Sequence, residues 1–259
     1  MRISLCQLTS TPDPAANLTL VEQGIEAAKE QGSRVVVFPE ATMACFGIPL
    51  GPVAEPLDGP WATRVREIAA EHGVLIVVGM FRPAEDGRVF NTLLVTGQGI
   101  DTHYDKIHLF DAFGFQESRT VAPGTEPLVI DLDGTRLGIA TCYDIRFPGL
   151  FTSLADRGAQ ATLLAASWGA GPGKKDQWEL LCRARALDST SWVLACGQAE
   201  PETTRGTAPT GIGYSTVATP FGQIHAQAGD KPELLTVDID LAQTTQAREA
   251  IPVLANRRF

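Results

Sequence analysis

The sequence predicts a single α/β domain that spans residues 1–259. Short apolar runs with the character of β-strands alternate with amphipathic helical patterns along most of the chain. No low-complexity linker or convincing internal repeat interrupts the alternation. Apolar residues make up 44% of the sequence and charged residues 20%, which is ordinary globular usage and sufficient for a substantial core.

The first half contains four expected strands and two expected helices. A polar turn at Pro39-Glu40 follows the second strand, and the turn at 85–87 separates the last two strands, which we expect to be neighbours in a sheet. The expected elements are a strand at 2–8, a helix at 17–30, a strand at 34–38, a helix at 61–72, and strands at 74–80 and 90–96.

The second half is expected to be rich in strands. Its elements are a strand at 135–141, a helix at 148–157, a strand at 161–166, a helix at 174–190, and strands at 192–196, 213–218 and 234–239. Cys142 therefore lies at a strand-to-helix turn. The strands at 213–218 and 234–239 complete a second half of the chain that is rich in strands. We expect the tail after Leu241 to wrap across a neighbouring element or subunit.

The net charge and the lengths of the apolar runs argue against nucleic-acid and membrane partners. A formal charge of -9 argues against a nucleic-acid partner, because a phosphate-binding face needs clustered Lys and Arg. The first eight residues are too short an apolar run for a signal peptide, and no stretch reaches membrane-spanning length, so we expect a cytoplasmic protein with no membrane partner.

We expect no metal and no cofactor. The five cysteines are odd in number and scattered, which favours reduced thiols, and the four histidines lack the i, i+4 spacing of a helical zinc site. The glycine-rich segment 169–173 lacks the strand-then-helix context of a dinucleotide loop. We interpret it as a flexible loop near a pocket entrance.

Three residues form a candidate catalytic set. Glu40 and Cys142 each follow an apolar strand directly, at the sheet edge where α/β proteins collect function, and Lys106 lies in a mixed segment that could border the same site. A thiol that attacks an amide needs a proton acceptor, which Glu40 can provide. Lys106 and the backbone N–H of Tyr143 can stabilise the oxyanion that forms.

Each of these residues also has an ordinary structural interpretation. A cysteine at a strand end is more often a small buried apolar residue. Lys106 can belong to a surface ion pair, and Glu40 can be a carboxylate at a helix start. Only the combination of the three favours catalysis.

The motifs around these residues resemble those of the nitrilase superfamily of carbon-nitrogen hydrolases, whose Glu-Lys-Cys triad has this chain order. Residues 38–40 resemble the glutamate motif, residues 104–110 the lysine motif and residues 142–148 the cysteine motif. The resemblance extends to the helix at 178–188 and the tail at 251–258. It implies a four-layer α-β-β-α sandwich and a homodimer, for which the helices near 148–157 and 174–190 are the candidate face.

The resemblance also implies a second glutamate that orients the triad. Residues 115–118, followed by Pro123-Gly124, match that region, so the role falls on Glu117; an exposed loop carboxylate is the alternative. The chain departs from the family at Gln177, where many relatives have a histidine. This departure weakens any transfer of substrate contacts from that loop.

Among superfamily members the motifs look most like the Nit amidases. These hydrolyse the amide of small 2-oxo-acid derivatives, such as α-ketoglutaramate or deaminated glutathione, through a thioester. Arg146 is a candidate for binding the substrate carboxylate, although a structural ion pair is the somewhat better interpretation. The aromatic residues that could line the pocket are Phe46, Phe113 and Trp168.

Other functions stay open. An N-carbamoyl amino-acid amidohydrolase, an aliphatic amidase or a nitrilase would use the same triad. A papain-like mechanism would pair Cys142 with His108, and a non-catalytic binding protein could retain the fold.

Overall fold

Two mixed β-sheets form the centre of the molecule. The computed structural model describes residues 1–203 and 208–258. The first sheet has the strand order β15-β1-β2-β3-β4-β5, with β8 paired to β4. Its strands are β1 (Arg2–Gln7), β2 (Val35–Val37), β3 (Leu75–Pro83), β4 (Val89–Gly97), β5 (Ile100–Asp105), β8 (Val121–Ala122) and β15 (Glu233–Asp238).

The second sheet is built from the other half of the chain. Its strand order is β14-β13-β12-β11-β10-β9, and β10, β11 and β12 run parallel to one another. The strands are β9 (Leu128–Leu132), β10 (Thr135–Thr141), β11 (Ala161–Ala166), β12 (Trp192–Gly197), β13 (Thr216–Ala218) and β14 (Ile224–Gln227).

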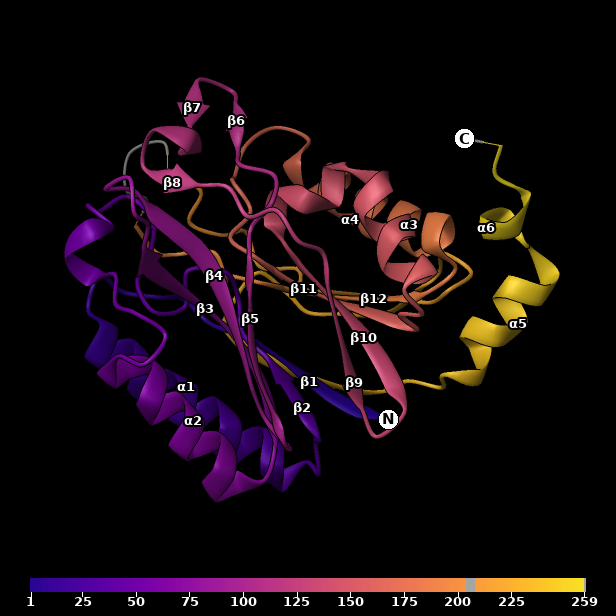
Figure 1. Cartoon of the computed structure of the whole chain (residues 1–259), viewed down its shortest axis with the longest axis horizontal. Coiled ribbons are helices and arrows are strands. Elements are labelled where there is room, and N and C mark those ends of the chain that lie inside the picture. The colour runs from indigo at the N-terminus through magenta and orange to yellow at the C-terminus, as the bar shows by residue number, and fades with distance from the viewer. Residues whose placement is uncertain (204–207, 259) are drawn as a thin grey trace.

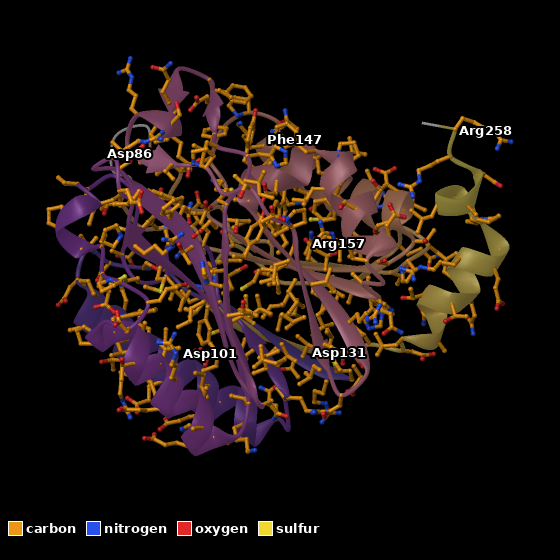
Figure 2. All side chains as sticks on the ribbon, in the orientation of Figure 1. Asp86, Asp101, Asp131, Phe147, Arg157 and Arg258 are labelled. Atoms are coloured by element: carbon orange, nitrogen blue, oxygen red, sulfur yellow. The ribbon has the colours of Figure 1, made fainter. Side chains whose placement is uncertain are left out.

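Helices cover the outer face of each sheet, which gives four layers (Figure 1). The helices α1 (Pro14–Glu30) and α2 (Pro60–His72) lie on the first sheet, and α3 (Pro148–Asp156) and α4 (Lys174–Ser189) lie on the second. Apolar side chains that alternate along strands of both sheets, such as Val37, Val77, Leu137 and Leu163, form one buried cluster. Figure 2 shows side chains filling the space between the sheets. The predicted four-layer sandwich is confirmed.

Helix starts and ends follow local chemistry. The Asp13 side chain accepts a hydrogen bond from the N–H of Ala15 and caps α1, whose buried stripe includes Val21 and Ile25. The helix α2 ends at Gly73, which has a φ of 63° and so adopts the left-handed conformation that glycine tolerates. Helix α1 begins three residues before the predicted start because the cap and Pro14 extend it.

The final strand of the chain joins the first sheet. The sequence predicts a strand at 234–239 but does not assign it to a sheet; in the structure β15 pairs antiparallel with β1 at the edge of the first sheet, with Arg2 opposite Asp238. The hydroxyl oxygens of Ser4 and Thr236 lie 2.6 Å apart and share a hydrogen bond. The two ends of the chain therefore share one sheet.

The tail crosses elements of its own chain. It contains α5 (Ala242–Ala250) and α6 (Val253–Asn256), which lie at the right of Figure 1. Arg248 donates to the carbonyl of Ala159, and Arg257 forms an ion pair with Asp156 at 2.5 Å. Within residues 1–203 and 208–258, no helix has the length and apolar character needed to span a membrane.

A small hairpin projects beyond the sheets. It consists of β6 (Asp111–Ala112) and β7 (Phe115–Gln116), and its turn residues Phe113 and Gly114 both have positive φ angles, of 55° and 80°. The hairpin follows Lys106 in the chain and precedes the short 3₁₀ helix η2 (Glu117–Arg119). Phe115 of this hairpin lines the same pocket as Lys106 and Glu117, so the hairpin lies beside the candidate site.

Candidate active site

The two sheets bring the candidate catalytic residues together. Glu40 follows β2 in the first sheet, whereas Cys142 follows β10 and Ser167 follows β11 in the second sheet. The backbone N–H of Ser167 donates to Oε2 of Glu40 at 2.8 Å, so it joins the carboxyl ends of strands from both sheets. This is the edge where parallel strands present functional side chains.

A buried ammonium lies between two carboxylates. Nζ of Lys106 lies 2.8 Å from Oε1 of Glu40 and 2.9 Å from Oε2 of Glu117, and the Lys106 side chain is 2% exposed. Burial alone would lower the pKa of Lys106, but the charges of Glu117 and Glu40 outweigh this effect and raise it well above its usual range. The two carboxylates therefore stabilise Lys106 in its charged, ammonium form.

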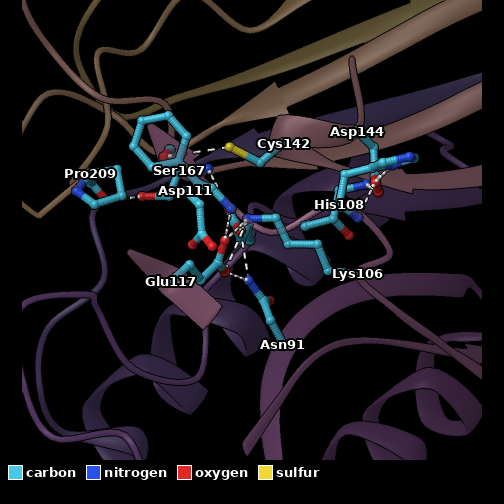
Figure 3. A network of polar contacts seen from close by, with 12 residues as sticks. Asn91, Lys106, His108, Asp111, Glu117, Cys142, Asp144, Ser167 and Pro209 are labelled. Atoms are coloured by element: carbon cyan, nitrogen blue, oxygen red, sulfur yellow. Dashed lines mark hydrogen bonds and ion pairs between the residues drawn. The ribbon is translucent and has the colours of Figure 1, made fainter. Parts of the chain in front are cut away.

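Asn91 also holds the two carboxylates. Its Nδ2 donates to Oε1 of Glu40 at 2.7 Å and to Oε1 of Glu117 at 3.2 Å (Figure 3). The backbone N–H of Phe110 donates to Oε2 of Glu117 at 2.6 Å. Asn91 was not predicted from the sequence, because it is one polar residue within the expected strand at 90–96.

Cys142 begins the short 3₁₀ helix η3 (Cys142–Arg146) in a left-handed conformation, with a φ of 45°. This conformation is costly for a residue with a side chain and is maintained by the surrounding structure. Sγ lies 3.7 Å from the carbonyl oxygen of Ser167. Burial, and then the charge of Glu40, raise the pKa of the Cys142 thiol well above its usual range, although Lys106 acts in the opposite direction.

Glu40, Lys106, Glu117 and Cys142 line one pocket. It includes eight of the predicted site residues: Glu40, Phe46, Lys106, Glu117, Cys142, Tyr143, Arg146 and Trp168. Phe113 is not among the lining residues; it lies on the β6–β7 turn and is 72% exposed. The lining residues that the sequence did not single out as site residues include Phe110, Phe115, Lys174 and Pro209.

Arg146 lies in the pocket wall without a carboxylate partner among the described residues. Its Nη2 donates to Oε1 of Gln177 at 2.7 Å, and its guanidinium carbon lies 5.0 Å from the Trp168 ring. Gln177, the residue that departs from the family pattern, thus orients Arg146. The ion pair that was the competing interpretation of Arg146 is absent from the described part of the chain.

His108 pairs with Asp144 and not with the Cys142 thiol among the described residues. Its Nδ1 lies 2.7 Å from Oδ1 of Asp144, and its ring stacks on Phe147 at 3.7 Å between centroids. It is not among the residues that line the pocket. In residues 1–203 and 208–258, no group of three or more His, Cys, Asp or Glu side chains is arranged to hold a metal ion.

Curated relatives match this chain over most of its length. A hydrolase of Mycobacterium tuberculosis is 55% identical, covering 99% of this chain and 95% of its own. The omega-amidase NIT2 of Xenopus tropicalis is 32% identical with the same coverage of both chains. The deaminated glutathione amidase of Escherichia coli O157:H7 is 36% identical and covers 80% of this chain and 76% of its own.

Solved structures agree with the fold. Nit3 of Saccharomyces cerevisiae, a member of branch 10 of the nitrilase superfamily, superposes with a TM-score of 0.88 at 27% identity, covering 100% of this chain and 97% of that chain. A variant of the amidase from Nesterenkonia sp. AN1 gives 0.83 at 27% identity, covering 100% of this chain and 94% of that chain. In that structure an acetamide moiety is covalently added to the active-site cysteine.

The family model for carbon-nitrogen hydrolases matches residues 2–249. This match agrees with the predicted superfamily and with a hydrolase that acts on carbon–nitrogen bonds other than peptide bonds. The chain belongs to the carbon-nitrogen hydrolase family.

Proposed function

We propose that the protein is a cysteine-dependent amidase that hydrolyses the carboxamide of a small, carboxylate-bearing substrate, such as a 2-oxo-acid amide. The observation that carries the proposal is the buried cluster of Glu40, Lys106 and Glu117 in the same pocket as Cys142. The relatives named omega-amidase and deaminated glutathione amidase support this substrate class.

In the first step, Sγ of Cys142 attacks the amide carbon while Glu40 accepts the thiol proton. The raised pKa of Cys142 keeps the thiol protonated in the resting enzyme, so proton transfer accompanies attack. The carbonyl oxygen becomes an oxyanion. An N–H of Lys106 and the backbone N–H of Tyr143 stabilise it by electrostatic interaction.

In the second step, Glu40 returns the proton to the substrate nitrogen and the carbon–nitrogen bond breaks. A primary amide releases ammonia, a secondary amide releases an amine, and the acyl group stays on Cys142 as a thioester. Glu40 then accepts a proton from water, which attacks the thioester, and the thiol is restored with release of the acid. Glu117 holds the Lys106 ammonium in place throughout.

Arg146 is the proposed partner of the substrate carboxylate. Nη2 of its guanidinium donates a hydrogen bond to Gln177, which fixes the orientation of the group. Its Nε has no hydrogen-bond partner in the described part of the chain. A planar guanidinium pairs well with a carboxylate. Phe46 and Trp168 supply apolar walls in the same pocket.

The test is the release of ammonia or amine from a panel of substrates, with Cys142→Ala as the inactive control. The panel contains α-ketoglutaramate, deaminated glutathione, simple aliphatic amides, N-carbamoyl amino acids and nitriles. Turnover of the first two by the wild type alone supports the proposal. Preference for an N-carbamoyl amino acid, an aliphatic amide or a nitrile would assign the triad to that other reaction, and no turnover by a folded enzyme would favour a binding role.

We further propose that residues 1–259 act as one domain in a cytoplasmic homodimer. All five cysteine side chains are buried, which is consistent with a reducing compartment. On α4, Leu180 is 64% exposed and Leu187 is 44% exposed, and such apolar side chains favour a covered helical face. Light scattering of the wild type and of Leu180→Glu tests the assembly; a monomeric wild type would contradict it.

A further inference from the structure

We propose that Lys174 is a second substrate-binding cation, which holds an anionic group at the pocket mouth while Arg146 holds another deeper in the pocket. The inference rests on the proposed amidase function. It assigns the enzyme to amides that carry two carboxylates.

Lys174 is the first residue of α4 and lines the same pocket as Arg146 and Cys142. A cation at the N-terminal end of a helix is unfavourable, because the helix dipole places partial positive charge there. The position is therefore poorly explained by helix stability. It is well explained by a negatively charged ligand.

No carboxylate of the described residues neutralises Lys174. Its ammonium lies 3.5 Å from the centroid of the Phe113 ring and 5.7 Å from that of Phe110. The adjacent Lys175, by contrast, forms an ion pair with Glu179 at 2.5 Å. Aromatic faces hold a cation without cancelling its charge, so Lys174 keeps its positive charge available.

The two pocket cations are close enough to influence each other. Partial burial, and then the charge of Arg146, lower the pKa of Lys174. Trp168 contacts both residues, since its Nε1 donates to the backbone carbonyl of Lys174 at 2.9 Å and the Arg146 guanidinium carbon lies 5.0 Å from its ring. One anionic group on each cation would relieve this repulsion.

The charge balance of the pocket supports an anionic ligand. Glu40 and Glu117 carry two negative charges, and Lys106, Arg146 and Lys174 carry three positive charges, so the lining has a net charge of +1 while the whole chain carries -9. Because Lys106 is held by the two glutamates, the excess charge resides on Arg146 and Lys174.

The relative depth of the two cations follows from their neighbours. Arg146 contacts Gln177 and Trp168, and Trp168 is buried. Lys174 contacts Phe113, which is exposed on the β6–β7 hairpin at the top of Figure 1. Lys174 therefore meets the part of the substrate nearest to solvent.

The experiment compares three substrates in the wild type and in Lys174→Met, which keeps the length of the side chain and its contact with Phe113. The substrates are deaminated glutathione with two carboxylates, α-ketoglutaramate with one, and a neutral aliphatic amide. We expect the KM for deaminated glutathione to rise about 10- to 100-fold, as for loss of one charge-assisted hydrogen bond. The kcat and the other two KM values should stay within about threefold.

Lys175→Met is the matched control, because it removes a neighbouring charge outside the pocket lining. Equal losses with all three substrates, or a fall in kcat alone, would overturn the inference and leave the proposed amidase function intact. If the wild type turns over none of the three, calorimetry still tests the role of Lys174. It compares the binding of deaminated glutathione to Cys142→Ala with its binding to the double variant that also carries Lys174→Met. Equal affinity of the two proteins, or no binding to either, would overturn it.

Discussion

Oδ1 of Asp144 lies 2.7 Å from Nδ1 of His108, and it also accepts a hydrogen bond from the backbone N–H of His108 at 3.0 Å. Its Oδ2 accepts the backbone N–H of Thr141 at 2.9 Å and the hydroxyl of Tyr104 at 2.7 Å. This fully buried carboxylate therefore joins β5 and the segment after it, which contains Lys106, to the turn after β10, which contains Cys142.

This relationship predicts different results for two substitutions. The hydrogen-bond partners of Asp144 are divided between its two carboxylate oxygens, and Asp144→Asn leaves only one oxygen to accept from them. We therefore expect the turn to shift and kcat to fall about 100-fold, as for a misplacement of about 1 Å. His108→Ala retains most of the activity, because the imidazole does not line the pocket. Steady-state kinetics check both variants, with circular dichroism as the folding control; an inactive His108→Ala beside an active Asp144→Asn would favour a histidine-dependent mechanism.

The charge of Glu40 contributes to the raised pKa of Cys142, which gives a pH prediction. Burial and then the Glu40 charge raise the pKa of Cys142, whereas Lys106 lowers it. In Glu40→Gln the second raising effect is lost and the lowering effect remains. The pKa of Cys142 should therefore fall, and more thiolate should be present at a given pH above neutrality.

The measurement is the rate of alkylation of Cys142 by iodoacetamide against pH, followed by mass spectrometry of the peptide that contains it. The midpoint should lie at lower pH in Glu40→Gln than in the wild type. Amidase activity of the same variant should fall about 10²- to 10⁴-fold, because Glu40 is the proposed general base. A midpoint that does not move would show that the Glu40 charge does not act on the thiol.

Lys106 should be essential for stability as well as for activity. Lys106→Met leaves two buried carboxylates without their cation, which costs about 3–5 kcal/mol of unfolding free energy. Because the folded-state pKa of Lys106 is raised, its contribution is fully present below the ordinary lysine pKa and is lost only as the pH rises through the raised value. The difference in urea unfolding between wild type and variant should thus be constant from neutral to mildly alkaline pH.

A double variant separates charge from packing in this prediction. Lys106→Met combined with Glu117→Gln removes one of the two uncompensated charges, so it should be more stable than Lys106→Met alone. Equal stability of the single and double variants would mean that the loss arises from packing around the lysine stem.

The residues at strand ends were predictable from the sequence, whereas those that depend on strand register were not. Glu40, Lys106 and Cys142 could be found because apolar runs precede two of them and a family motif surrounds each. Asn91 lies within β4, opposite Phe81, and only the pairing of that strand turns its amide toward Glu40 and Glu117. Lys174 resembled an ordinary polar residue at a helix start, because nothing local indicates that a distant hairpin contributes an aromatic ring to it.

The pairing of β15 with β1 could not be read from the sequence for a related reason. The strand at the end of the chain has the same apolar pattern whichever sheet it joins. The choice depends on contacts between residues more than 230 positions apart, such as Arg2 and Asp238. Local patterns predict that a strand exists, but they do not specify its neighbour.

Asn91 provides the last prediction, because its amide lies between two negative charges. Asn91→Ala removes a donor from both glutamates, and we expect kcat to fall about tenfold, as for a lost hydrogen bond to a charged group. Asn91→Asp should cost at least about another tenfold at neutral pH, because it places a third carboxylate within hydrogen-bond distance of the first two. Lower pH should partly restore Asn91→Asp, since a protonated aspartic acid can donate a hydrogen bond, but should not restore Asn91→Ala. The profile of kcat against pH for the two variants checks this, and parallel profiles would mean that Asn91 acts only by filling space.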